Sequence, residues 1–442
     1  MLKKFNILKS INLQKHARNR IPGMTQLLSK RPDQFSFGVW PGYYSKASGV
    51  EVWDISGNQY TDMSISGIGA IILGYADQDV DDSVKLSISK GVSCSLNCPE
   101  EVELADLLCE IHPWADQVRF ARTGGESMAI AVRIARAYTK KDKIAFCGYH
   151  GWHDWYLSAN LNTENALGEH LLSGLNPLGV PKGLSGTAFP FYYNKLDELK
   201  NIVTNNKNDI AAIIMEPIRN VDPIPEFIEG VRAIADEIGA VLIIDEISSG
   251  FRINIGGAHM VLGIKPDIAV FSKALGNGYA IAAIIGKSNV MQSAQDTFIS
   301  STCWTERIGP TAAIATIKKH RKYDVARHLI ETGNQIQSSW KEMAEKYSLD
   351  ITVGGIPPLS HFLFNYDNNL SIKALFVQLM LEKKFLASNL FYAMYAHKQE
   401  HIDKYKLAID EVFYQLKEII TTNQVEKELK GQPAISGFKR LI

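Results

Sequence analysis

The chain has 442 residues, and 47 lysines and arginines balance 47 aspartates and glutamates. This neutral balance argues against nucleic acid or a membrane surface as a partner, because both attract proteins with a basic excess. The apolar runs are far shorter than the roughly 20 residues that span a bilayer. The length favours two structural lobes.

The N-terminal segment and the cysteines indicate a cytoplasmic protein. The first 32 residues carry several bases and no acid, but little serine, so we expect a helical arm there and not a transit peptide. The five cysteines form no CxxC pair, and Cys94 and Cys98 have no histidine cluster nearby. We therefore expect reduced, structural thiols and no metal site.

Short apolar runs and turns predict the first elements. Val50 and Val52 lead into a turn at residues 56–58, which is typical of a short antiparallel hairpin. Further on, "QVRFA" at 117–121 predicts a strand, "RTGGES" a turn, and residues 128–138 a helix.

The middle third alternates buried strands with helices. Nearly continuous apolar runs end at Glu216, Glu246 and Lys273, and "KIAFC" at 143–147 is a shorter run of the same kind. Such runs are typical of strands buried on both faces of a parallel sheet. Residues 227–238 have helical spacing before Gly239. We expect a large α/β domain over 76–324, with 1–75 and 325–442 together forming a smaller one.

Polar residues follow these runs, and ligands of open α/β sheets lie beyond the carboxyl ends of the strands. A glycine pair that opens a helix can bind phosphate, an aspartate can hold a ring nitrogen, and Tyr149 can stack on a ring. A lysine can form a Schiff base with an aldehyde. Together these groups indicate pyridoxal 5'-phosphate (PLP), although a lone lysine is usually a solvated surface charge. The residues are Thr123, Gly124, Gly125, Tyr149, Glu216, Asp245 and Lys273.

From Ile21 to the C-terminal helices the chain resembles the class III PLP-dependent aminotransferases, and within them the glutamate-1-semialdehyde 2,1-aminomutase group. The segments that carry the resemblance are "GVEVWDISGNQYTDM", "VRFARTGGESMAIAVRIARAYTKKDKIAFCGYHGWHD", "AAIIMEPI", "VLIIDEISSGFR" and "FSKALGNGYAIAAIIGK". The resemblance implies PLP-dependent fold type I. That fold has a large, mainly parallel-sheet domain, a small α+β domain formed by both termini, and a homodimer with shared active sites.

The resemblance also implies roles for single residues. Lys273 would form the Schiff base and shuttle a proton, and Asp245 would pair with the pyridinium nitrogen. Tyr149 and Ile247 would cover opposite faces of the ring, and Thr302 would reach the phosphate from the neighbouring subunit. The other cofactor-binding residues would be Thr123, Gly124, Gly125, His150 and Glu216, with Thr305 the less favoured alternative to Thr302.

Several further residues match the family without a decided role. Glu126 and Glu216 either line the site or only tie loops down. Arg252 is expected to be structural. We do not expect His150 or His153 to act as a base, because the lysine already does that work.

The sequence departs from the aminomutases mainly on the substrate side. Gly125 stands where they have a threonine, so backbone amides must carry more of the phosphate contact. Their substrate-binding arginine has only the displaced Lys30 and Arg31 as counterparts, the segment at 64–70 is smaller, and the lid reads "NPLGVP". We therefore predict an aminotransferase with glutamate as donor and a keto sugar as acceptor. The alternatives are an intramolecular aminomutase and a catalytically dead binding protein, and retention of Lys273 and Asp245 disfavours the latter.

Overall fold

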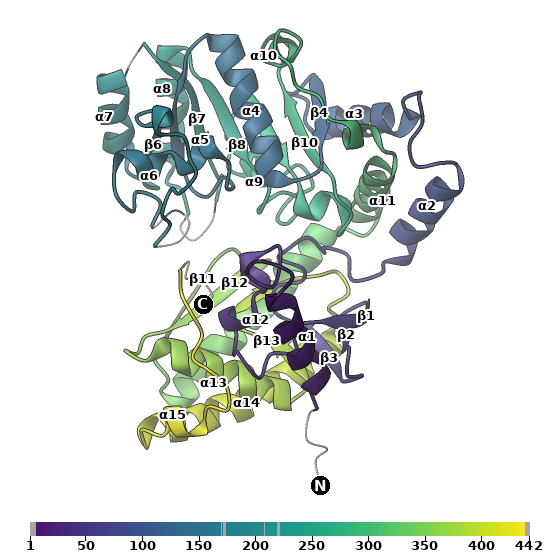
Figure 1. Cartoon of the computed structure of the whole chain (residues 1–442), viewed down its shortest axis with the longest axis vertical. Helices are drawn as coiled ribbons and strands as arrows, with labels where there is room; N and C mark the ends of the chain where they lie inside the picture. Colours follow the sequence, from purple (N-terminus) through teal and green to yellow (C-terminus); the bar gives the residue numbers. More distant parts are fainter. Residues whose placement is uncertain (1–5, 169, 171–173, 207, 219–221, 438–442) are drawn as a thin grey trace. The chain divides into compact units, whose positions relative to one another are not determined.

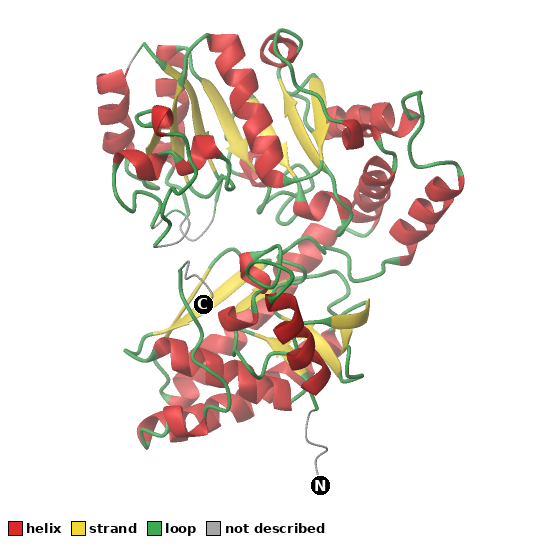
Figure 2. Ribbon diagram, viewed as in Figure 1, coloured by secondary structure: helices red, strands yellow, loops and turns green. Residues whose placement is uncertain are grey.

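The structure is a computed structural model that describes residues 6–168, 170, 174–206, 208–218 and 222–437. It divides into two compact units, one of residues 78–327 and one that combines 1–77 with 328–442. Figures 1 and 2 show the elements of each unit. Within the described residues, no helix is long and apolar enough to cross a membrane.

The unit of residues 78–327 is built on a seven-stranded sheet in the order β4-β10-β9-β8-β7-β5-β6. β10 runs antiparallel to both of its neighbours, and every other pairing is parallel. The strands are β4 (Gln117–Ala121), β5 (Lys143–Cys147), β6 (Ala188–Pro190), β7 (Ile210–Met215), β8 (Val241–Asp245), β9 (Ile268–Phe271) and β10 (Ala282–Gly286).

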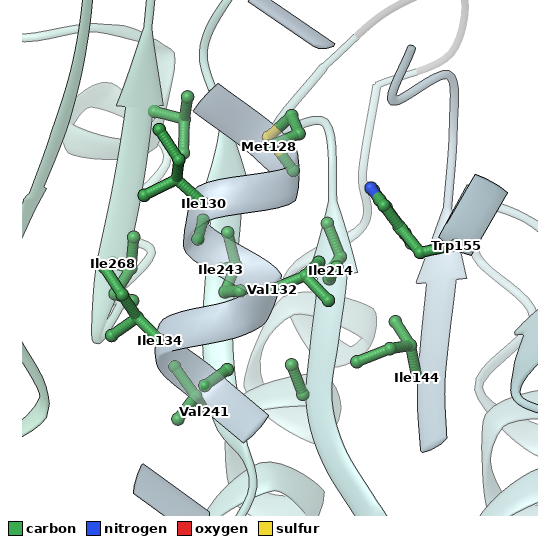
Figure 3. Close-up of a cluster of buried hydrophobic side chains, with 14 of the residues drawn as sticks. Met128, Ile130, Val132, Ile134, Ile144, Trp155, Ile214, Val241, Ile243 and Ile268 are labelled. Carbon is green, nitrogen blue, oxygen red and sulfur yellow. The ribbon is translucent and has the colours of Figure 1, made fainter. Parts of the chain in front are cut away.

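Helices cover both faces of this sheet. The helices are α2 (Gln78–Ser89), α3 (Pro99–Ile111), α4 (Gly124–Thr139), α5 (Asp154–Leu157), α6 (Ala159–Asn162), α7 (Leu196–Asn206), α8 (Pro225–Ile238), α9 (Ala258–Val261), α10 (Ser288–Met291), α11 (Ile308–Lys322) and the first residues of α12 (Val325–Tyr347). On one face, α4 packs its buried residues against Val241, Ile243 and Ile268 (Figure 3). On the other, α7 and α8 pack against Leu242 and Ile244. Burial on both faces explains why these strands read as continuous apolar runs.

The sequence-based elements of this unit are confirmed, with one correction. The predicted strands correspond to β4, β5, β7, β8 and β9, and α8 ends at Gly239, whose φ of 62° is left-handed. The expected start of a helix at Met128 is wrong, because α4 begins at Gly124. Two glycines have low helix propensity, but the carboxylate of Glu126 accepts from the backbone N–H of Thr123 and caps this first turn.

The second unit brings both ends of the chain together in one sheet. Its four strands lie in the order β1-β2-β3-β13, with β3 and β13 paired in parallel, and a second sheet has the order β11-β12-β14. The antiparallel β2–β3 pair confirms the predicted hairpin, and α1 is the expected N-terminal helix. The elements are α1 (Leu8–Arg18), β1 (Tyr44–Ser48), β2 (Glu51–Asp54), β3 (Gln59–Met63), β11 (Ile351–Gly354), β12 (Leu359–Phe364), α13 (Asn369–Glu382), β13 (Phe385–Ala387), β14 (Leu390–Tyr392), α14 (Gln399–Thr421) and α15 (Val425–Glu428).

The five cysteines are all unpaired thiols, and they differ in exposure. Cys147 is buried in β5, whereas Cys94 and Cys303 are exposed. That these thiols are structural stays a prediction.

Candidate active site

Lys273 lies directly after β9, on the short 3-10 helix Lys273–Gly276. Its backbone has a φ of 44°, a left-handed conformation that is uncommon for a residue with a side chain. Its Nζ donates a hydrogen bond of 2.8 Å to the Oγ of Ser248. Ser248 follows the neighbouring strand β8, where Asp245 lies opposite Val270. Ser248 and Lys273 thus follow two paired strands, and their side chains meet beyond the strand ends.

Asp245 ends β8 and is 2% exposed. One carboxylate oxygen, Oδ2, lies 2.8 Å from Nδ1 of His150, and the other, Oδ1, accepts the backbone N–H of Ile247 at 3.0 Å. Nε2 of His150 lies 3.1 Å from the carbonyl oxygen of Cys147. Two contacts therefore fix the carboxylate at the carboxyl edge of the sheet, and a third fixes the ring of His150.

The loop after β5 carries Tyr149, and the side chain of Glu216 binds the backbone of this loop. The Oε2 atom of Glu216 accepts the backbone N–H of Tyr149 at 3.0 Å. Gly148 has a φ of 110°, and a Cβ there would lie 2.6 Å from the same carboxylate oxygen. Tyr149 itself is half-buried. What the structure shows for Glu216 is thus anchoring of the Tyr149 loop, and its contact with a cofactor stays a prediction.

The first turn of α4 begins with the backbone N–H groups of Gly124 and Gly125, which no helical carbonyl precedes. The N–H of Glu126 is capped by the side chain of Thr123. A Cβ on Gly124 would lie 3.0 Å from the side chain of Ile247, so only glycine lets Ile247 pack this closely. N–H groups and the helix dipole both favour a phosphate here.

Glu126 ties this turn to the segment that contains Thr302. Its Oε2 accepts the N–H of Arg122 at 2.9 Å, and its Oε1 accepts the indole N–H of Trp304 at 3.0 Å. Glu126 therefore acts as a loop anchor. Thr302 and Thr305, at the two ends of one 3-10 turn, are exposed. Their contact with a phosphate stays a prediction.

Three features of this site were not foreseen. Ser248, the His150–Asp245 pair and Trp304 all join the predicted residues. Arg252 supports Ser248, because its buried side chain donates from Nε to the Ser248 carbonyl oxygen at 2.6 Å. Of these residues, only Ser248 could have been recognised from the sequence as a site residue, because it follows β8 as Lys273 follows β9.

The basic residues near the N-terminus have a different environment. Arg31 is 5% exposed and Asp33 is 6% exposed, and the guanidinium binds the carboxylate through two nitrogens. Lys30 is exposed. Arg31 is therefore engaged within its own unit.

These groups match a known class of enzyme. The family model described as aminotransferase class-III matches residues 38–356, and the chain belongs to this family. The chain is 33% identical over 433 residues to the 3-aminobutyryl-CoA aminotransferase of Cloacimonas acidaminovorans (strain Evry), covering 95% of this chain and all of the relative. It is 30% identical over 398 residues to the glutamate-1-semialdehyde 2,1-aminomutase of Clostridium kluyveri, covering 84% of this chain and 92% of that one.

A solved structure supports the same fold. The FumI protein of Sphingopyxis sp. MTA144, determined in a PLP-bound form, superimposes with a TM-score of 0.85 at 22% identity and covers 97% of this chain and 99% of its own. The family and fold predictions are confirmed, and the chain is a PLP-dependent enzyme of the aminotransferase and aminomutase family. The residues present fit PLP, since a lysine, an aspartate and an open helix N-terminus lie at the strand ends of one unit.

Proposed function

We propose that the chain is an aminotransferase that moves an amino group from L-glutamate to a carbonyl substrate. The observation that supports this most strongly is the geometry of adjacent strand ends. Asp245 ends β8 and Lys273 follows β9, and the carboxylate and the amine each form hydrogen bonds with neighbouring groups. A lysine amine can form a Schiff base with an aldehyde, and an aspartate at the end of the neighbouring strand can hold a ring nitrogen.

PLP, when bound, supplies an aldehyde carbon and an electron-withdrawing ring. On the side of the protein, Asp245 would hold the ring nitrogen, because its carboxylate is buried and oriented by His150 and Ile247. The amides of Gly124 and Gly125 would hold the phosphate. Tyr149 and Ile247 are both half-buried and would lie against the ring.

Lys273 would move the proton. In its protonated form Nζ donates to the Ser248 hydroxyl oxygen, and in its neutral form the same nitrogen can accept a proton from the substrate carbon. Ser248 keeps the amine at one place during both states, and Arg252 in turn fixes the backbone of Ser248.

The acceptor that we propose lacks a free carboxylate next to its reacting carbon. Arg31, the nearest counterpart of the aminomutase arginine, is buried in its pair with Asp33. A keto sugar meets this condition. A 3-oxoacyl thioester meets it as well, and the name of the Cloacimonas relative points to that chemistry.

We also propose a homodimer in which Thr302 reaches the phosphate of the neighbouring subunit. Two observations support this role. Thr302 is exposed, and its segment is tied to the α4 turn through Trp304 and Glu126.

The test is a two-stage turnover experiment on the PLP-loaded enzyme. L-Glutamate alone should release one 2-oxoglutarate per site and leave the enzyme aminated. Keto sugars, 3-oxobutyryl-CoA and glutamate-1-semialdehyde are then added separately, and the aminated product is quantified by mass spectrometry. Amination of a carboxylate-free acceptor supports the proposal. Release of no 2-oxoglutarate, together with isomerisation of the semialdehyde, would show an aminomutase instead.

A further inference from the structure

Gly125 leaves a specific space beside the phosphate-binding turn. Cα–Cβ bonds tilt toward the N-terminus of a helix, so a side chain at position 125 would point to the end where the first amides of α4 open. Another side chain lies in that space. A Cβ placed on Gly125 would lie 3.0 Å from Nδ1 of His153 and 3.2 Å from its Cε1.

The Nδ1 atom of His153 is itself unsatisfied. It is buried from solvent and has no hydrogen-bond partner among the described residues. Burial also lowers the pKa of His153, which favours a neutral imidazole with one N–H. A buried polar atom without a partner costs stability unless a ligand satisfies it.

The imidazole is held in place by its neighbours. Its ring stacks on Trp152 with centroids 4.4 Å apart, and His153 stands at the N-cap of α5. Gly151, with a φ of 106°, allows the close approach of this loop to Gly125, because a Cβ at position 151 would lie 2.9 Å from the Gly125 Cα. The loop is therefore packed so that Nδ1 lies beside Gly125 in the first turn of α4.

We propose that His153 anchors the cofactor by donating from Nδ1 to its phosphate, in the space that a side chain at position 125 would occupy. His153 thereby supplies the side-chain donor that Gly125 lacks. This inference rests on the proposed position of the phosphate at α4, and it is independent of the amino donor and acceptor.

The experiment measures binding of pyridoxamine 5'-phosphate and of pyridoxamine to the apoenzyme by calorimetry. Neither compound has an aldehyde, so neither reacts with Lys273. The wild-type chain should strongly prefer the phosphorylated compound. His153→Ala should weaken its binding about tenfold or more, the effect of one hydrogen bond to a charged group, and change pyridoxamine binding less than about twofold.

Two further variants separate the hydrogen bond from packing. His153→Phe keeps a ring on Trp152 but has no N–H, and it should weaken binding as the alanine variant does. His153→Asn keeps a donor near Nδ1 and should retain most of the affinity. Equal losses for both compounds, or a phenylalanine variant that binds as the wild type does, would overturn the proposal and assign His153 a packing role.

A reciprocal exchange tests the shared space directly. Gly125→Thr alone should weaken binding of the phosphorylated compound, because its Cβ crowds Nδ1 of His153. In the His153→Ala background the same threonine has room, and its hydroxyl should restore affinity to within about threefold of wild type. Additive losses in the double variant would contradict a shared site. A wild-type chain without preference for the phosphorylated compound would overturn both the phosphate position and the role of His153, whereas a failed acceptor panel would leave both intact.

Discussion

Buried polar side chains form two kinds of cluster in this chain. At the strand ends of the 78–327 unit, Asp245 and its partners lie near a half-buried lysine whose backbone is strained. In the other unit, Arg31 is paired with Asp33, and the buried Asp62 accepts from the hydroxyl of Tyr75 at 2.6 Å. The residue types are similar. The difference is that the first cluster lies at the carboxyl ends of parallel strands, where open α/β sheets bind their ligands, whereas the second lies outside that sheet.

This comparison predicts that substitutions in the first cluster reduce activity and that substitutions in the second reduce stability. The largest expected effect is at Lys273. Lys273→Ala removes both the nucleophile and the proton carrier and should lower turnover at least about 10⁴-fold. The thermal midpoint should stay within a few degrees, because the amine of a half-buried lysine binds a serine hydroxyl and removing it leaves no charge without its partner. A large loss of thermal stability with residual turnover would show that Lys273 serves the fold and not the reaction.

Asp245→Asn should have the next largest effect. The amide keeps the shape and can still accept from Ile247, but it has no charge to stabilise a protonated ring nitrogen. We expect a fall of about 10³-fold in the rate of a single turnover with L-glutamate, measured by stopped flow. His150→Asn is the matched positioning variant and should cost less, since it acts only through Asp245. A reversed order of the two effects would assign the chemistry to His150.

Arg31→Ala tests whether the second cluster, which contains the Arg31–Asp33 pair, contributes to stability and not to activity. It leaves the carboxylate of Asp33 buried without its cation, which should cost about 3 kcal/mol of unfolding free energy in urea. KM values of the folded enzyme should not change. Lys30→Ala, at an exposed position, is the control and should change neither quantity. A raised KM with unchanged stability would identify Arg31 as a substrate-binding residue instead.

The smallest expected effect is a pH dependence from His397. Burial lowers its pKa from 6.5 to about 4, and its neutral ring accepts from the Met394 N–H at Nδ1 while Nε2 lies 2.8 Å from the Asp62 carbonyl oxygen. Below pH 6.5 the unfolded chain binds a proton that the folded chain excludes, so stability falls as the pH drops toward 4. At pH 5 the loss should be about 2 kcal/mol.

Urea unfolding at pH 7 and pH 5 checks this effect. His397→Gln should be less stable than wild type at pH 7 but should lose less between the two pH values, because the titrating ring is gone. Other buried histidines contribute to both chains equally. The same pH slope in both would show that His397 does not titrate as described.

Much of the cofactor side could be predicted from the sequence, because its residues follow apolar runs that become neighbouring strands. The start of α4 could not, since glycines have low helix propensity and the capping carboxylate of Glu126 acts only once the turn has formed. The His150–Asp245 pair joins β5 and β8, which β7 separates, so no local pattern indicates it.

The environment of Arg31, the expected counterpart of a substrate-binding arginine, was harder to predict from the sequence for a different reason. Arg31 and Asp33 are two residues apart, but their burial as a pair depends on packing in three dimensions. Ser248 could have been suspected from the sequence, because it follows β8 just as Lys273 follows the neighbouring β9.

The visible absorption spectrum of the PLP-loaded enzyme, recorded before and after L-glutamate, tests the central claim most directly. We expect a band of the protein-bound cofactor that Lys273→Ala lacks, and that L-glutamate removes in the wild type with release of 2-oxoglutarate. A band that Lys273→Ala retains unchanged, or a wild-type chain that binds no PLP, would contradict the assignment of Lys273 and the site built around it.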